Sequence, residues 1–263
     1  MTIAAHRASW SAGGRMVVDG VTLEVRSGGM LGLLGPNGSG KSSLLRLLAG
    51  LRRVSSGAVT LGGKDISAHR RGVLARRVAV VEQQVATEAP VTALDIVRLG
   101  RTPHRGLLSA WTAEDEAAVR QALLSVGLDA MASRSWHTLS GGERQRVQIA
   151  RALAQLAAMP RPAALLLDEP TASLDPGQRA SLLRLLRRLA AEGLAILIVL
   201  HDLNEAAFVA DRVALLAGGR LLAEGPPVDV LQPARLAAVY GVGFRALDVA
   251  LLPDYARVAH HPG

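Results

Sequence analysis

Residues 35–43 read Gly35-Pro36-Asn37-Gly38-Ser39-Gly40-Lys41-Ser42-Ser43, and the stretch up to Ser42 fits the pattern G-x-x-x-x-G-K-[ST] at every fixed position. A short apolar run over residues 30–34 precedes it, and leucines at helical spacing follow over residues 42–51. These flanks predict a buried parallel strand before the loop and a helix after it. A strand, a glycine-rich loop and a helix in this order indicate an α/β fold that binds a nucleoside triphosphate.

The loop has the chemistry of a phosphate cradle. Its glycines let the backbone approach a phosphate without a clash at Cβ, and the start of the following helix attracts negative charge. We expect residues 35–43 to bind the nucleotide, with Lys41 reaching the β- and γ-phosphates and Ser42 ligating Mg²⁺. A glycine-rich turn with a chance Lys-Ser pair is the alternative, and the flanking patterns disfavour it.

A second apolar run, over residues 163–167, ends in Asp168-Glu169-Pro170. A carboxylate at the end of a buried strand can hold Mg²⁺ through water, because this cation gives up its hydration shell reluctantly. We assign that role to Asp168 and expect Glu169 to polarise the water that attacks the phosphate. A strand that ends in a solvated acidic turn is the other interpretation, and the neighbouring phosphate loop disfavours it.

A third motif, Leu139-Ser140-Gly141-Gly142-Glu143, precedes a helical pattern that runs through Ala158. Ser140 and Glu143 have the spacing of a capping box, so one interpretation is simply a well-started helix. The paired glycines cost stability in a first turn, yet they suit a backbone that an anion must approach closely. Because the chain already has one phosphate loop, we expect this helix start to serve the ATP of a second copy in a two-fold dimer.

The three motifs together resemble those of ATP-binding cassette (ABC) ATPases, over about residues 2–245. The resemblance implies an α/β P-loop NTPase fold, with a RecA-like core, a mixed sheet, an antiparallel β subdomain and an α-helical subdomain that carries the third motif, called the signature. We therefore expect one nucleotide-binding domain over 2–245. Its parts are the β subdomain and core over 2–91, the helical subdomain over about 92–159 and more core over 160–225, with short helices and a tail over 226–263.

The resemblance adds a glutamine to the catalytic and metal-binding residues. Gln83 aligns best with the Q-loop glutamine, which helps to sense Mg²⁺ and links the site to the helical subdomain. Glu82 stands where the family more often has proline, and Gln84 leaves the register open.

Three further residues match positions that contact nucleotide in this family. His201 follows an apolar run over 194–200 and matches the switch histidine at the γ-phosphate. Asp175 closes a Ser-Leu-Asp motif that resembles the D-loop, which touches the opposite subunit. Trp10 lies 25 residues before Gly35, where the family places an aromatic ring against adenine, although an ordinary aromatic at a strand end is the alternative.

The composition excludes some classes of protein. The chain has 263 residues and no cysteine, so it can form no disulfide and no cysteine-ligated zinc site. Its uninterrupted apolar runs are strand-sized and its first residues lack an apolar signal core, so we expect a chain that is soluble by itself. The net charge of +8 comes mostly from scattered arginines with no basic helix rich in aromatics, so no nucleic-acid partner is expected.

The cargo class rests on two short segments. Residues 99–104 (Leu-Gly-Arg-Thr-Pro-His) and 236–241 (Leu-Ala-Ala-Val-Tyr-Gly) are similar to ATPase subunits of iron-siderophore, haem and cobalamin importers. The similarity implies a homodimer bound to transmembrane permease subunits at the cytoplasmic face of the inner membrane, with a substrate-binding protein outside. A soluble assembly ATPase, such as one of iron–sulfur cluster biogenesis, is the alternative. DNA-repair ABC ATPases carry long coiled coils or zinc modules, which do not fit here.

Several local patterns predict individual elements. Residues 16–18 and 21–25 are strand-like and are expected to be joined by a turn at Asp19-Gly20. Thr112 should begin a helix with Ala117 on its apolar face, and Gly127 should end it. A helix is expected over 176–191, and Gly218-Gly219 predicts a hairpin.

Overall fold

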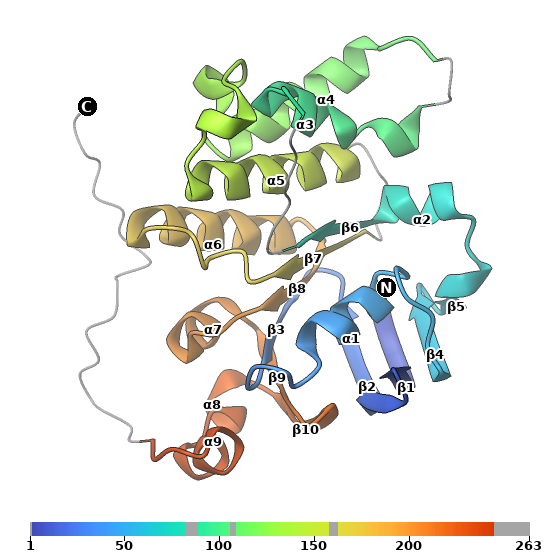
Figure 1. Cartoon of the computed structure of the whole chain (residues 1–263), viewed down its shortest axis with the longest axis vertical. Helices are drawn as coiled ribbons and strands as arrows, with labels where there is room; N and C mark the ends of the chain where they lie inside the picture. Colours follow the sequence, from blue (N-terminus) through green and yellow to red (C-terminus); the bar gives the residue numbers. More distant parts are fainter. Residues whose placement is uncertain (1, 83–88, 106–108, 158–162, 245–263) are drawn as a thin grey trace.

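The computed structural model describes residues 2–82, 89–105, 109–157 and 163–244. Figure 1 shows a central sheet with helices α5 and α6 on one side and helix α1 with a smaller sheet on the other. The central sheet has the order β10-β9-β3-β8-β7-β6. Its strands are β3 (Met30–Leu34), β6 (Val78–Val81), β7 (Ala164–Asp168), β8 (Ala195–Val199), β9 (Arg212–Ala217) and β10 (Arg220–Gly225).

The central strands are parallel, and only β10 runs antiparallel, to β9. All residues of β3, β7 and β8 are buried, as expected for strands covered on both faces. Val199 pairs with both Leu33 and Asp168, so β3, β7 and β8 end at the same level. The loops that follow these three strands therefore meet at one edge of the sheet, where open α/β sheets place their ligands.

The second sheet is antiparallel, in the order β2-β1-β4-β5. Its strands are β1 (Thr2–Ala12), β2 (Arg15–Arg26), β4 (Ser56–Leu61) and β5 (Lys64–Asp65). The predicted turn at Asp19-Gly20 is wrong, because the β1–β2 turn lies at Gly13-Gly14 and residues 15–26 form one strand. Gly20 has a φ of 60° at a shift of register, so it makes a bulge within β2 instead of a turn.

Three helices form the layer at the top of Figure 1: α3 (Ala93–Leu99), α4 (Ala113–Ser125) and α5 (Gly141–Leu156). Each begins with a complete capping box, at Thr92, Thr112 and Ser140. The start of α4 agrees with the sequence, and Gly127, with a φ of 66°, follows its end. Ala117 is exposed, however, and Asp115 and Ala118 are buried instead.

The remaining helices connect the strands of the core. They are α1 (Lys41–Leu48), α2 (Arg71–Arg77), α6 (Pro176–Ala191), α7 (Leu203–Val209), α8 (Pro227–Val230) and α9 (Pro233–Tyr240). The bounds of α6 and the hairpin at Gly218-Gly219 agree with the sequence. Helix α1 ends before Leu51, because Gly50 adopts a φ of 69° after it. The sequence patterns did not predict α2.

The apolar core is divided by the central sheet. Met30 and Leu34 of β3 face a cluster that includes the buried leucines of α6, whereas Leu31 and Leu33 face one that includes the leucines of α1 and the antiparallel sheet. The site at the sheet edge is thus held from both sides by packed layers.

In the described part of the chain, no helix combines the length and the apolar character that crossing a bilayer requires.

Candidate functional site

The phosphate loop follows β3 and lines a cavity of about 200 Å³. The described residues that line it are Val17, the run 37–43 and Glu169. A Cβ on Gly35 would lie 1.9 Å from the carbonyl oxygen of Leu216, and one on Gly40 would lie 2.5 Å from that of Val17. Both glycines have positive φ, so only glycine fits at these two positions. A Cβ on Gly38 would meet nothing within 4 Å. Gly38 therefore faces open space.

Lys41 is buried at the start of α1, and its ammonium group lies over the loop. Its Nζ donates to the carbonyl oxygens of Gly35 at 2.7 Å and of Pro36 at 3.0 Å. Burial lowers the pKa of the Lys41 ammonium, while the charges of Glu169 and Asp168 act in the opposite direction. A lysine has three protons to donate, so this one can change partners when a stronger acceptor such as phosphate arrives.

Asp168 ends β7 inside the same region. Its Oδ1 is buried and has no hydrogen-bond partner, and its carboxyl group is hydrogen-bonded to the Ser42 side chain. Burial raises the pKa of the Asp168 carboxyl, and the Ser42 hydrogen bond opposes that rise. No cluster of three His, Cys, Asp or Glu side chains suited to a metal occurs among the described residues. The pair fits a cation such as Mg²⁺, which keeps waters and takes its other ligands from phosphate.

Glu169 and His201 come together from the ends of β7 and β8. His201 Nε2 lies 2.5 Å from Oε1 of Glu169. Glu169 has a φ of 52°, a left-handed conformation that is unusual for a residue other than glycine and often found at functional sites. The Glu169 side chain is mostly buried and lines the phosphate-loop cavity, whereas His201 is exposed. The structure therefore brings together two residues that the sequence places 32 positions apart.

Trp10 lies on β1, where its backbone pairs with Val18, the neighbour of the cavity-lining Val17. The guanidinium of Arg52 lies over the ring, 4.2 Å from its centroid. This stacking contact was not expected from the sequence.

The signature residues begin helix α5 and are absent from the described lining of the phosphate-loop cavity. Ser140 Oγ accepts from the backbone N–H of Glu143, and Glu143 Oε2 accepts from the backbone N–H of Ser140 at 2.7 Å. The Ser140 backbone hydrogen bond lowers the pKa of the Glu143 carboxyl. The structure therefore contains the capping box that the spacing of Ser140 and Glu143 predicted.

The two signature glycines differ in their surroundings. Gly141 is exposed, and a Cβ there would make ordinary contact with Ser173 at 3.6 Å. Gly142 is buried, and a Cβ there would lie 2.6 Å from Oε1 of Gln178 and 3.2 Å from Leu174. A side chain at position 142 would therefore crowd the turn before α6, whereas Gly141 leaves its backbone open to a ligand.

Of the two other predicted site residues, Asp175 and Gln83, the structure describes the first. Asp175 is the N-cap of α6, and its Oδ1 accepts from the backbone N–H of Gln178 at 2.9 Å. It lies in the turn that packs on Gly142. Gln83 and Gln84 fall outside the described residues.

Residues 99–104 lie against the end of α5. Arg101 is buried, pairs with Asp115 at 2.8 Å and donates to the carbonyl oxygen of Ala154 at 3.0 Å. His104 Nε2 lies 2.7 Å from the carbonyl oxygen of Gln155. Free carbonyls at a helix end favour such donors, so this segment caps the C-terminus of the signature helix. Sequence reasoning missed Arg101; an arginine with an acid 14 residues later was its only signal.

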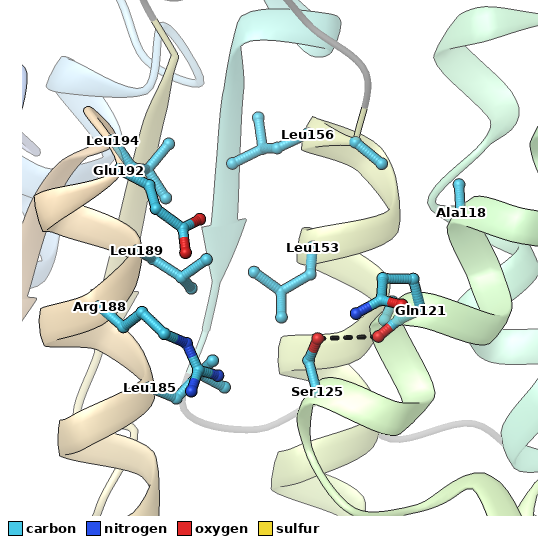
Figure 2. A pocket seen from close by; sticks show the side chains of 12 residues that line it. Ala118, Gln121, Ser125, Leu153, Leu156, Leu185, Arg188, Leu189, Glu192 and Leu194 are labelled. Carbon is cyan, nitrogen blue, oxygen red and sulfur yellow. Dashed lines mark hydrogen bonds between the residues drawn. The ribbon is translucent and has the colours of Figure 1, made fainter.

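Larger hollows lie away from the phosphate loop, and two of them adjoin α5. Figure 2 shows one of them between α4, α5 and α6, with Arg188 on α6 and Glu192 at its C-cap. Its volume is about 400 Å³, and leucine and alanine side chains make up most of its lining. The other, about 560 Å³, lies where α2, the end of α1, β6 and α5 meet, and its lining includes Leu51, Glu82, Arg151 and Gln155. Neither has a glycine-rich loop at a helix start, so neither has the chemistry of the phosphate site.

A family model described as ABC transporter matches residues 18–172 of this chain. The hemin import ATP-binding protein HmuV of Streptomyces coelicolor is 46% identical over 87% of this chain and 79% of that protein. The protein of the same name from Bordetella pertussis is 42% identical over 96% of this chain and 97% of its own length.

Solved structures agree with this match. A chain of a structure described as an inward-facing conformation of a putative metal-chelate type ABC transporter superposes with a TM-score of 0.78 and 27% identity, covering 92% of this chain and 89% of that one. An ATP-binding cassette in its ADP conformation gives a TM-score of 0.79 with 25% identity, covering 91% of this chain and 98% of the other.

Proposed function

This chain belongs to the ABC transporter ATPase family, and we propose that it energises the import of haem or of a related iron chelate or corrinoid. The family match makes it an ATPase whose hydrolysis is coupled to transport by an importer. The observation that carries the cargo class is the 42% identity to a hemin import protein over nearly the whole length of both chains. Haem is our first choice among the three cargoes.

The proposed hydrolytic centre lies at the ends of β3, β7 and β8. Lys41 and the loop N–H groups bind the phosphates, and Ser42 and Asp168, with Gln83, would hold Mg²⁺, which would supply positive charge to neutralise the phosphates. Glu169 orients and polarises the attacking water. His201, already 2.5 Å from Glu169, contacts the γ-phosphate and holds the carboxylate in place.

We propose that the ATPase acts as a homodimer. The described lining of the phosphate-loop cavity includes no signature residue, and Gly141 is exposed on another part of the chain. A second copy related by a two-fold axis can offer its Ser140 and Gly141 to the nucleotide held by the first. The exposed Ser173 and Asp175 lie on the same surface as Gly141 and would face the partner too.

The permease is proposed to dock in the hollow between the end of α1, α2 and α5. Leu51, which is 61% exposed, offers an apolar contact there, and Arg71, Glu82 and Arg151 add charges. Glu82 immediately precedes Gln83, so a permease segment in this hollow would adjoin the Q-loop. In this proposal the chain lies at the cytoplasmic face of the inner membrane, and an extracytoplasmic binding protein delivers cargo to the permease.

Deletion and complementation in the source organism test the cargo. A strain without this chain should lose growth on haem as its sole iron source, and the wild-type chain should restore it. Glu169→Gln should fail to restore growth, whereas Glu114→Gln, at an exposed residue of α4, should succeed. Loss of ferric siderophore or cobalamin uptake with haem use intact would move the proposal to those cargoes. If all three uptakes persist and the chain copurifies with no permease, the importer proposal is wrong and an assembly ATPase replaces it.

A further inference from the structure

Glu205 on α7 is a buried carboxylate to which the proposed mechanism gives no task. It is 1% exposed, and both of its oxygens are engaged. Oε2 accepts from the hydroxyl of Thr171 at 3.0 Å, and Oε1 accepts from the guanidinium of Arg179 at 2.7 Å. Burial raises the pKa of the Glu205 carboxyl, and these two partners oppose the rise. A buried charge is costly unless it is paired in this way.

Both partners of Glu205 belong to the segment that follows the hydrolytic glutamate. Thr171 lies two residues after Glu169, and Arg179 lies in the first turns of α6. Arg179 also donates to the carbonyl oxygen of Leu174 at 3.4 Å. One carboxylate therefore fastens both ends of the exposed turn over 173–175.

The same residue is tied to the switch histidine through the start of α7. The backbone N–H of Glu205 donates to Oδ1 of Asp202 at 3.2 Å, and that of Asn204 donates to the same atom at 2.8 Å. Asp202 is the N-cap of α7 and directly follows His201. His201 thus directly precedes the N-cap of α7, and Glu205 lies in the first turn of that helix.

The turn over 173–175 also supports the signature. Ser173 and Leu174 fill the space beside Gly142, so a shift of this turn would displace the start of α5 or open a gap there. A continuous set of contacts runs from His201 through Glu205 to the turn and on to the signature of the same chain.

We propose that Glu205 is a positioning residue that fixes the turn over 173–175 relative to His201. The switch in a chain's own nucleotide site and the surface that the chain offers to its partner's nucleotide then move as one body. This inference rests on the proposed roles of His201 and of the 173–175 turn. Glu205 acts through its neighbours and does not touch the nucleotide.

Glu205→Gln tests the link, because it keeps the shape of the side chain and removes the charge that Arg179 needs. Nucleotide affinity of the purified full-length chain should stay within about twofold, since the phosphate loop is untouched. The kcat of ATP hydrolysis, per chain able to bind nucleotide, should fall at least about tenfold. Asn204→Ala is the matched control, one position away on the exposed side of α7, and it should leave both values unchanged. An unchanged kcat per binding-competent chain in Glu205→Gln overturns the inference, even if the melting temperature falls.

A distance measurement separates positioning from stability. The chain has no cysteine, so spin labels can be placed specifically at cysteines introduced for the exposed Ala172 and Asn204. The distance distribution between them should be narrow in the parent and broad in Glu205→Gln. Equal widths would contradict the inference. If Glu205→Gln does not fold, Thr171→Val removes one hydrogen bond only, and the same two measurements decide, with a smaller loss of kcat expected.

His201→Ala distinguishes this inference from the proposal beneath it. If His201→Ala hydrolyses ATP at the parent rate, the proposed role of His201 fails, and the inference fails with it. If His201→Ala is slow and Glu205→Gln is fast, only the inference is overturned.

Discussion

The two helix starts assigned to phosphate, those of α1 and α5, are built in opposite ways. Helix α1 begins at Gly40 with no side-chain cap and no acid in its first turn, and it opens onto a cavity. Helix α5 begins with Ser140 and Glu143 capping each other, and it lies on a surface. Uncapped backbone N–H groups can donate hydrogen bonds to an anion at once, whereas capped N–H groups must first give up the side chain that caps them. We therefore expect α1 to bind nucleotide in a single chain and α5 only as two chains close.

The largest effect should separate binding from chemistry at the α1 side. Glu169→Gln keeps the side-chain shape and removes the base, so turnover should fall by about 10²–10⁴-fold while the ATP affinity of the chain stays near that of the parent. Steady-state hydrolysis and equilibrium nucleotide binding measure the two quantities. Glu114→Gln controls for the loss of one carboxylate, and parental turnover in Glu169→Gln would refute the assigned role.

The two signature glycines offer the next test, at the α5 side. Gly141→Ala should leave the melting temperature unchanged, because its Cβ has room, yet stop hydrolysis by blocking the approach of the partner's phosphate. Gly142→Ala should lose about 1–3 kcal/mol of stability through crowding against Gln178 and Leu174. Thermal melts and ATPase rates of the two variants measure these two effects separately.

Mixing two kinds of inactive chain tests whether the start of helix α5 acts on the nucleotide of its own chain or on that of the partner. A dimer of one Lys41→Ala chain and one Gly141→Ala chain contains one site with an intact phosphate loop and an intact signature. We expect that dimer to recover part of the turnover that each variant lacks alone. If such mixtures recover nothing while a mixture of the Lys41→Ala chain with wild type is active, the cross-subunit arrangement is wrong.

A stability measurement sharpens the α1 side further. The folded pKa of Asp168 is raised, so its ionisation favours the unfolded chain, and this penalty is absent at low pH. The penalty grows as the pH rises from 3.8, the ordinary pKa of an aspartate carboxyl, through the raised pKa of the folded state, and it stays constant above. Asp168→Asn should therefore stabilise the chain at neutral pH, by roughly 1 kcal/mol for each unit of raised pKa, and less in acid. Thermal melts across this range check the trend, and an equal gain at every pH would contradict it.

The smallest effect is expected at the cap of α5. Glu143→Gln retains an acceptor for the Ser140 N–H, so the free energy of unfolding should change by less than about 0.5 kcal/mol and kcat by less than about twofold. Glu143→Ala removes the acceptor and should cost about 1 kcal/mol. A large loss of turnover in Glu143→Gln alone would show that the carboxylate has a role beyond capping.

The sequence predicted the parts of the molecule that depend on local pattern. The strands around the phosphate loop, the bounds of α6 and the capping box at Ser140 need only nearby residues. The bulge at Gly20 was read as a turn, because a positive φ in glycine serves both and only pairing with β1 distinguishes them. The packing of Gly142 depends on residues more than 30 positions away, which spacing does not reveal.

The sequence predicted which residues make up the candidate site, but it did not predict the contacts between them. Lys41, Asp168, Glu169 and His201 follow from motifs, and the structure gathers the last two into a pair. Arg101 and Glu205 were missed because each is an ordinary polar residue until its partner is known. Their roles come from burial, which composition does not show.

The segment over 99–104, one of the two local clues to cargo, directs the polar groups of Arg101 and His104 into the chain. Arg101 and His104 bond carbonyl oxygens at the end of α5, and Gln155 from the same end donates to the carbonyl of Val78 beside the proposed permease hollow. Changes in this segment would therefore alter the shape of the proposed permease hollow, and they would not alter an affinity for the transported cargo. Similarity over residues 99–104 would then reflect similarity in the shape of the permease. Two importers that carry the same cargo through differently shaped permeases should differ in this segment.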